Sequence, residues 1–153
     1  MYIFDLDSTL ANIDHRLPHQ DTRDGGAKAL FNALCVNDTP IPQMCRLFRT
    51  LDARNFVRIW TGRTEAVREQ TLDWIAKHVD ARWAVIARDF PKMLMMRPVG
   101  DRRPDNELKL MWLNALSPTD RSLIEMAFDD RDRVIKMYRD NGIMCLQVAD
   151  GNF

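Results

Sequence analysis

The chain has 153 residues, and its 22 Lys and Arg residues balance 22 Asp and Glu residues. With 46% hydrophobic residues and zero formal net charge, this composition is typical of one globular domain and excludes a disordered chain. It also excludes non-specific coating of DNA, because a neutral protein has no overall positive field to hold a polyanion. Any contact with nucleic acid must therefore come from a local group of basic side chains.

The chain shows no pattern of membrane insertion or export. Its apolar runs are far shorter than the roughly 20 residues of a membrane span, and Met1 leads directly into a strand-like segment. We therefore expect no signal peptide and no membrane anchor. Cys35, Cys45 and Cys145 are odd in number and widely spaced, which suits neither a disulfide framework nor a zinc site. The expected location is a reducing cytoplasm.

Short apolar segments alternate with amphipathic ones along the chain. Strands are predicted by short β-branched or aromatic runs at residues 2–6, 56–60, 83–87, 123–128 and 143–149. Helical spacing recurs at residues 27–36, 41–53, 64–78, 105–116 and 131–142. Between these segments, residues 61–63 (TGR) predict a turn, and the Met- and Arg-rich residues 92–105 predict a loop.

This alternation predicts βαβ units, and hence an α/β fold: a three-layer α/β/α sandwich around a parallel, Rossmann-like sheet. We expect residues 1–153 to form a single domain. Residues 12–39 fit the alternation poorly, so we interpret them as a small cap-like insertion after the first strand. In such a sheet, ligands bind at the carboxyl ends of the strands.

Polar clusters follow three of the predicted strands at their carboxyl ends. They are Asp5-Leu6-Asp7, Thr61-Gly62-Arg63 and Asp129-Asp130-Arg131. Because the carboxyl ends of parallel strands meet at one edge of the sheet, these side chains are expected to lie together.

Asp5 and Asp7 lie two positions apart at a strand end, so an extended backbone points both carboxylates to the same side. Two close carboxylates repel each other unless a cation or a proton lies between them. Mg²⁺ suits such a pair, because it takes oxygen ligands from one or two carboxylates and from substrate phosphate. A turn with two solvated Asp residues would show the same pattern.

The other polar residues extend this hypothesis. Asp129 and Asp130 would supply further metal ligands, Thr61 a hydroxyl, Arg63 a planar fork for phosphate oxygens and Lys109 a point charge. Alternatively, Asp129 or Asp130 caps the helix that follows it, Thr61 caps its own helix, and Lys109 is a solvated helix residue. Each alternative is reasonable alone, but all of them together are improbable at a single sheet edge.

The order of these motifs resembles the haloacid dehalogenase superfamily of phosphotransferases. The motifs are 4-FDLDSTL-10, 60-WTGR-63, Lys109 and 128-FDDR-131. A closer resemblance, to the phosphatase domains of bacteriophage polynucleotide kinases, rests on 105-DNELK-109, 128-FDDRDRVIKMYRDNGI-143 and 145-CLQVADGNF-153. It extends over nearly the whole chain.

The resemblance implies a two-step phosphoryl transfer. Asp5 would attack phosphorus to form an aspartyl-phosphate, and Asp7 would protonate the leaving alcohol and then activate the hydrolytic water. Mg²⁺ would bind Asp5, the backbone carbonyl of Asp7 and Asp129, with Asp130 as a further or supporting ligand.

The resemblance also implies a set of phosphate- or substrate-binding positions: Thr61, Gly62, Arg63, Lys109, Arg16 and Asp105. Thr61 and Lys109 would hold the phosphoryl oxygens. Arg16 could equally be a surface residue of the insertion. Asp105 could simply pair with Lys109, four residues later on the same helix.

Two features differ from the sequence patterns of the proteins that this chain resembles. Ser8 stands where the family usually has Gly, at the turn after Asp7. The chain also lacks a GxxxxGK[ST] phosphate-binding loop, so no kinase activity is expected. Arg97, Arg102 and Arg103 are candidates to contact a nucleic-acid backbone, or else are ordinary loop charges.

The expected function is therefore that of a Mg²⁺-dependent phosphomonoesterase that removes 3′-phosphate from nucleic-acid ends, with a separate kinase or ligase as a candidate partner. One alternative is a nucleotidase or another small-molecule phosphatase of the same superfamily. Another is a non-catalytic module that binds phosphate ends or only stores phosphate on Asp5. The presence of Asp7 favours turnover, because a phosphate store needs no acid or base two residues beyond its nucleophile.

Overall fold

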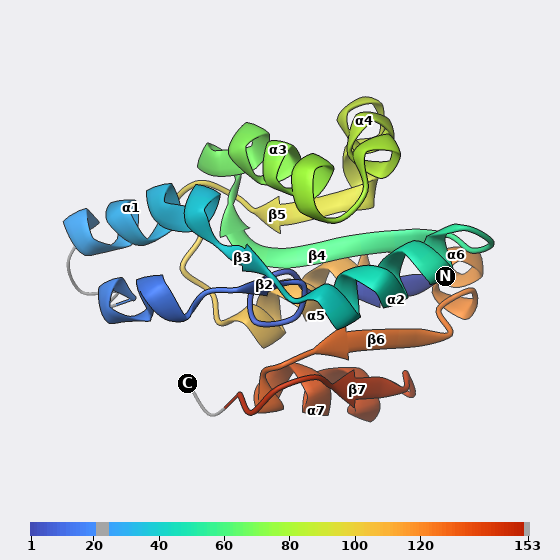
Figure 1. The fold of residues 1–153 in the computed structure, drawn as a ribbon. Coiled ribbons are helices and arrows are strands. Elements are labelled where there is room, and N and C mark those ends of the chain that lie inside the picture. Colours follow the sequence, from blue (N-terminus) through green and yellow to red (C-terminus); the bar gives the residue numbers. More distant parts are fainter. Residues whose placement is uncertain (21–24, 152–153) are drawn as a thin grey trace.

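A five-stranded parallel sheet forms the centre of the protein (Figure 1). The computed structural model describes residues 1–20 and 25–151, so residues 21–24 of the predicted insertion and the last two residues lie outside the description. In spatial order the strands are β5 (Leu94–Arg97), β4 (Val57–Thr64), β1 (Tyr2–Phe4), β6 (Met126–Asp129) and β7 (Cys145–Gln147). Every neighbouring pair is parallel.

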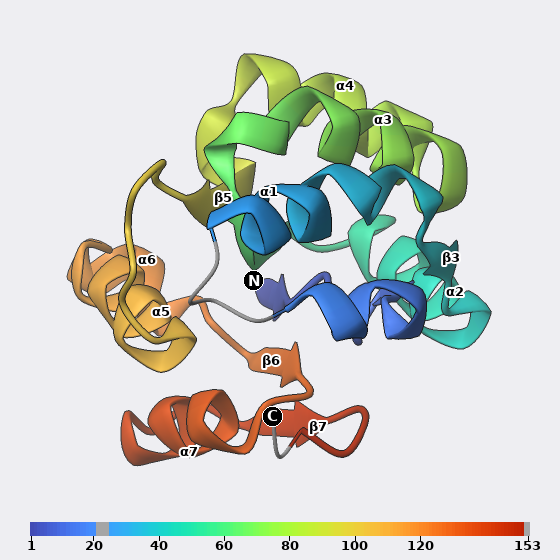
Figure 2. The same cartoon turned by 90° about the vertical axis from the view of Figure 1, so that its left-hand side faces the viewer.

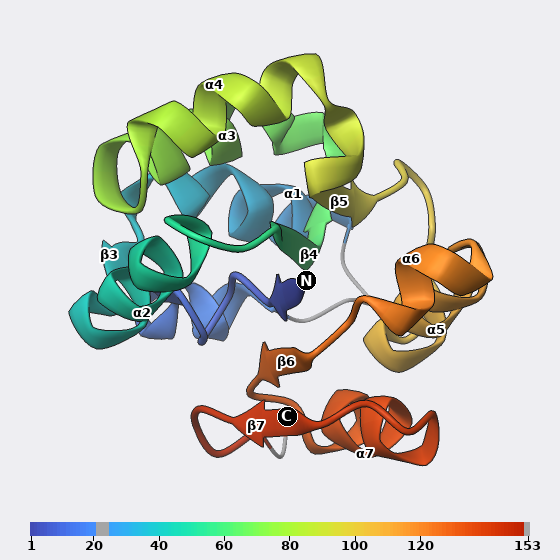
Figure 3. The ribbon, with the colours of Figure 1, turned by 90° about the vertical axis from the view of Figure 1, so that its right-hand side faces the viewer.

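The sheet is covered by helices on both faces, which confirms the predicted three-layer α/β sandwich (Figures 2 and 3). One face packs against α2 (Pro42–Asp52), α3 (Arg68–His78) and α4 (Ala81–Asp89). The other packs against α5 (Asp105–Asn114) and α7 (Asp132–Asp140), and the short α6 (Pro118–Ser122) precedes β6.

A hydrophobic core lies on each face of the sheet, because side chains alternate between the two faces along each strand. Phe4 points into the core beneath α2, α3 and α4, where it stacks on Phe128 with ring centroids 4.4 Å apart. Its neighbour Ile3 points into the opposite core with Trp60 and Tyr138. Successive strand residues face opposite sides of a sheet, so a three-residue strand at the centre is enough to anchor both layers.

The chain between β1 and α2 forms a separate small structure beyond the carboxyl ends of the strands (Figures 1 and 2). A two-stranded antiparallel sheet stands at its base, formed by β2 (Ala11–Asn12) and β3 (Thr39–Pro40). Its helices are η1 (Asp14–His19), α1 (Gly25–Ala33) and η2 (Leu34–Asn37). These elements lie within or directly beside the predicted insertion at residues 12–39.

The strand predicted at residues 83–87 is wrong, because these residues belong to α4. Asp80 caps this helix by accepting a hydrogen bond from the Trp83 backbone N–H at 2.8 Å. Trp83, Ala84 and Ala87 then face the core. A short apolar run is compatible with a buried strand or a buried helix, and here the cap and the helical spacing favour the helix.

Three other boundaries differ from the prediction. The loop predicted at 92–105 contains β5, whose Leu94 and Met96 are buried in the sheet. The turn predicted at 61–63 is strand, because β4 continues to Thr64 beyond a register shift, and α3 starts only at Arg68. The strand predicted at 123–128 begins only at Met126, after α6.

None of the helices in the described ranges has both the length and the apolar character needed to cross a membrane. Cys35, Cys45 and Cys145 are all buried and free, in agreement with the absence of a disulfide pattern in the sequence.

Candidate active site

A cavity of about 700 Å³ opens at the carboxyl ends of β1, β4 and β6. Most of the predicted site residues line it: Asp5, Asp7, Gly62, Arg63, Asp105, Lys109, Asp129 and Asp130. Helix α1 contributes Lys28, Phe31 and Asn32 to the same cavity. The structure thus brings the three polar clusters together, as the parallel arrangement of their strands requires.

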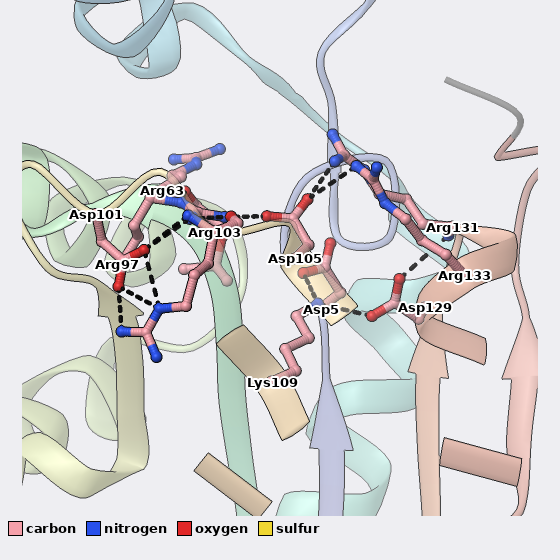
Figure 4. A network of polar contacts seen from close by, with 12 residues as sticks. Asp5, Arg63, Arg97, Asp101, Arg103, Asp105, Lys109, Asp129, Arg131 and Arg133 are labelled. Carbon is pink, nitrogen blue, oxygen red and sulfur yellow. Dashed lines mark hydrogen bonds and ion pairs between the residues drawn. The ribbon is translucent and has the colours of Figure 1, made fainter. Parts of the chain in front are cut away.

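Asp5 and Asp129 share the ammonium group of Lys109. The Lys109 Nζ donates to Asp5 Oδ1 at 2.6 Å and to Asp129 Oδ2 at 2.7 Å (Figure 4). Lys109 is buried on the inner side of α5, so its interpretation as a solvated helix residue is wrong. Burial alone would lower the pKa of Lys109, but Asp129 and Asp5 raise it well above its ordinary value, so the ammonium group stays charged.

Asp5, Asp129 and Asp130 form an acidic cluster that fits a divalent cation. One oxygen from each carboxylate lies within 4.8 Å of the others. The Asp130 Oδ2 is buried and has no hydrogen-bond partner among the described residues. Mg²⁺ binds such oxygen sets, and an unpaired buried carboxylate oxygen facing two further carboxylates is the donor that a cation would satisfy.

The electrostatics of this cluster agree with a missing positive charge. Burial, the largest cause, raises the pKa of Asp5 well above its usual range, and Asp129 and Asp130 add to the rise while Lys109 opposes it. Burial and the neighbouring Asp129 raise the pKa of Asp130 to about 6. Lys109 and Arg131 offset only part of the negative charge of the three buried carboxylates, and a bound cation would compensate the rest.

Asp7 stands apart from this cluster and is held by two arginines. Its Oδ1 accepts hydrogen bonds from Arg16 Nη2 and from Arg63 Nε, each at 2.7 Å. Burial alone would raise the pKa of Asp7, but Arg63 and Arg16 bring it below its ordinary value. The two arginines therefore favour the ionised form of the Asp7 carboxylate.

Asp38 contacts both arginines that hold Asp7, and no sequence motif predicted it. Its fully buried side chain accepts from Arg16 Nε and Nη2, both at 2.8 Å, and from Arg63 Nη2 at 2.5 Å. Its backbone oxygen accepts from Trp74 Nε1 at 2.7 Å. Asp38 lies in the predicted insertion, outside every motif, and nothing in its local pattern distinguishes it from a turn aspartate.

Arg16 is completely buried between Asp7 and Asp38, so its interpretation as a surface residue is wrong. Its side chain also lies over the ring of Phe31 from α1, 4.3 Å from the ring centroid. Arg16 therefore links the predicted insertion to the carboxylate of Asp7.

Asp105 pairs with two arginines rather than with Lys109. It accepts hydrogen bonds from Arg97 Nη2 and Arg131 Nη1, as Figure 4 shows. A Cβ atom at Gly62 would lie 2.9 Å from Asp105 Oδ1, so the missing side chain at position 62 makes room for this carboxylate. Asp105 therefore links Arg97 and Arg131 at the edge of the cavity, while Lys109, one helical turn later, donates to Asp5.

Thr61 and Ser8 shape the backbone around the cavity. Thr61 is completely buried, does not line the cavity and accepts a hydrogen bond from the Arg63 backbone N–H at 3.2 Å, so it is not the helix cap considered above. Ser8 adopts φ = 61°, in the left-handed region that favours Gly, and its N–H donates to the Ala11 carbonyl at 2.7 Å. The turn after Asp7 thus forms with serine where the family usually has glycine.

Comparisons with known proteins agree with this geometry. The chain is similar to one chain of the solved Pnkp1/Rnl/Hen1 RNA repair complex, with a TM-score of 0.74 and 25% identity over 99% of this chain and 43% of that chain. A second structure of the Pnkp1/Rnl/Hen1 complex gives a TM-score of 0.73 and 25% identity over 99% of this chain and 46% of the other. The chain spans less than half the length of either neighbour. The family model of the polynucleotide kinase PNKP phosphatase domain matches residues 1–153, so the chain belongs to this family of phosphatase domains.

Proposed function

We propose that this protein is a Mg²⁺-dependent phosphomonoesterase that removes 3′-phosphate from polynucleotide ends through an aspartyl-phosphate on Asp5. The observation that carries the proposal is the arrangement of the two carboxylates that follow β1. Asp5 is held by Lys109 beside an acidic cluster, whereas Asp7 is held separately by Arg16 and Arg63. The two groups thus have different environments, as a nucleophile and an acid–base group require.

In the first step an oxygen of Asp5 would attack phosphorus, form a new O–P bond and release the 3′-alkoxide. The Lys109 ammonium group orients Asp5 through Oδ1 and is placed to balance charge on the transferred group. The leaving oxygen takes its proton from Asp7, so Asp7 must be protonated when this bond breaks. Because the arginines favour ionised Asp7 in the free protein, we propose that the incoming phosphate draws Arg63 away from it. The pKa of Asp7 then rises, and Asp7 takes up from solvent the proton that it gives to the leaving oxygen.

In the second step a water would attack the phosphorus of the aspartyl-phosphate, and the O–P bond to Asp5 breaks. Asp7, now ionised, accepts a proton from that water as its oxygen approaches phosphorus. Arg16 and Asp38 keep the Asp7 carboxylate in place for this transfer. The products are inorganic phosphate and the regenerated Asp5 carboxylate.

Asp5, Asp129 and Asp130, together with the backbone carbonyl of Asp7, would hold Mg²⁺. When bound, the ion supplies positive charge that offsets the negative charge of the phosphate and of the carboxylates.

The size and charge of the cavity support a polynucleotide end as substrate. A volume of about 700 Å³ exceeds the need of a phosphate alone, and arginines line the cavity wall. We propose that residues 12–39 act as a cap over this cavity within a single domain, since α1 supplies part of its lining. The similar chains belong to an RNA repair complex, which favours an end-healing role beside separate kinase or ligase enzymes.

Phosphate release is the direct test. The substrates are an oligonucleotide with a 3′-phosphate, the same oligonucleotide with a 5′-phosphate, and mononucleotides, each with Mg²⁺ and with chelator. Asp5→Asn is the inactive control. Preferential Mg²⁺-dependent release from the 3′ end, lost in the control, supports the proposal. Faster release from mononucleotides would indicate a nucleotidase, and release from none of these substrates would indicate a non-catalytic module.

A further inference from the structure

A second, smaller groove continues from the candidate active site. It has a volume of about 370 Å³ and lies between α1, residues 64–67 and the loop at residues 98–102 that follows β5. Both cavities are lined by Lys28, Asn32, Arg97 and Arg102. A molecule bound in the active-site cavity could therefore extend into this groove without crossing bulk solvent.

Most of the groove surface is apolar, and Thr64 and Asp101 are the polar residues that line it away from its junction with the active site. Its apolar lining consists of Ala29, Ala33, Ala66, Val67, Pro98 and Val99. Val99 is 72% exposed, so its side chain presents apolar surface to solvent. Covering such a surface with a flat, weakly polar group is favourable, because apolar area leaves water.

Two cations at the junction are available for a ligand. Of the three arginines after β5 that were candidates for backbone contact, Arg97 binds Asp105 and Arg103 binds Asp101. Arg102 and Lys28 have no carboxylate within ion-pair distance in the described part of the chain. Asp101, which also lines the groove, is already held by Arg103 through Nε and Nη2. Counted over the residues that the structure describes, the junction therefore has net positive charge.

We infer that this groove binds the nucleotide on the 5′ side of the terminal one. This inference rests on the proposed function and names the feature that selects a strand over a mononucleotide. With the 3′-phosphate at Asp5 and the terminal nucleoside in the larger cavity, the next phosphodiester lies between Lys28 and Arg102. The preceding sugar and base then cover the apolar surface at Ala66 and Val99. The cations bind the charge of the phosphodiester and the apolar surface accepts any base, so the groove selects for chain length and not for sequence.

The experiment compares kcat/KM for a nucleoside 3′-monophosphate and for the dinucleotide that carries a 3′-phosphate, with thymidine in the deoxy series and uridine in the ribo series. The wild-type protein is expected to prefer the dinucleotide by about tenfold or more, the usual effect of a charged hydrogen bond. In the double variant Lys28→Ala/Arg102→Ala this ratio is expected to approach one. Val99→Asp, which brings a negative charge to the exposed groove surface, is expected to reduce the ratio in the same direction.

The matched control is Arg54→Ala/Lys92→Ala, which removes the same two charges from exposed positions that precede β4 and β5 at the opposite end of the sheet. It is expected to keep the wild-type ratio. A wild-type dinucleotide-to-mononucleotide ratio near one would refute nucleotide binding in the groove and leave the phosphatase function standing. The same holds if the Lys28→Ala/Arg102→Ala variant leaves the ratio unchanged. Failure of wild-type protein to release phosphate from either substrate would instead overturn the proposed function itself.

Discussion

Lys109 and Asp5 lie 104 positions apart in the sequence and are joined by a hydrogen bond of 2.6 Å at the centre of the candidate site. Lys109 also reaches Asp129 at 2.7 Å, so one ammonium group connects α5 with the ends of β1 and β6. This arrangement makes Lys109 the first position to test, because its charge compensates two carboxylates and would face the transferred phosphoryl group.

Lys109→Ala is expected to reduce kcat by about 100-fold or more, the usual effect of removing one preorganised donor from a site of developing charge. Steady-state phosphate release with a 3′-phosphorylated oligonucleotide measures the change. Lys136→Ala is the control, since Lys136 is exposed and pairs with Asp140 on the same helix. Equal rates for Lys109→Ala and the control would contradict the role given to Lys109.

Addition of Mg²⁺ is expected to raise the Tm of the wild-type protein, because a ligand that binds only the folded state stabilises it. Asp130→Asn is expected to lose most of this Mg²⁺-dependent shift while keeping a wild-type or higher Tm in chelator, because it removes one of three mutually repelling carboxylates. Differential scanning fluorimetry with a Mg²⁺ titration measures both values. A full Mg²⁺ shift in this variant would place the ion elsewhere.

Asp38→Ala is expected to lower the free energy of unfolding by about 3–5 kcal/mol, because it leaves the buried Arg16 and Arg63 without their shared carboxylate. Denaturant unfolding followed by circular dichroism measures this loss. Asp73→Ala removes an exposed partner of Arg88 and is expected to cost less than about 1 kcal/mol. If the two variants were equally stable, the buried network would not support the fold.

Ser8→Gly is expected to stabilise the protein by about 0.5–1 kcal/mol and to keep phosphate release, because glycine adopts φ = 61° without the steric cost that serine has there. The gain is partly offset by the greater freedom of glycine in the unfolded chain. Ser8→Ala keeps the Cβ atom and should give no gain. A destabilised Ser8→Gly would show that the serine side chain contributes more than the backbone strain costs.

Local sequence patterns were sufficient to place most of the candidate site. Asp5 and Asp129 follow apolar strand segments, and the carboxyl ends of neighbouring parallel strands meet, so the sheet topology brings them together. The spacing around Lys109 predicted a helix, which the structure contains as α5. These features depend on local backbone geometry and on the parallel direction of the strands, and the alternation of strand and helix patterns predicts both. The catalytic roles remain predictions until the variants are measured.

Long-range contacts decided the rest. Residues 83–87 could form a strand or a helix by composition, and packing of Trp83 against Phe48 and the sheet accompanies the helix. Asp105 could have paired with Lys109 on its own helix, but Arg97 and Arg131 approach it from β5 and from the segment after β6.

By itself the sequence determined the family, the alternation of strands and helices, and the strand ends that carry Asp5, Asp7 and Asp129. Only the tertiary structure decided which charges pair. Asp38 meets Arg16 and Arg63 across separations of 22 and 25 positions, at the end of a segment with no motif of its own. A buried charge is retained where an opposite charge reaches it in space, and sequence separation carries no information about that approach.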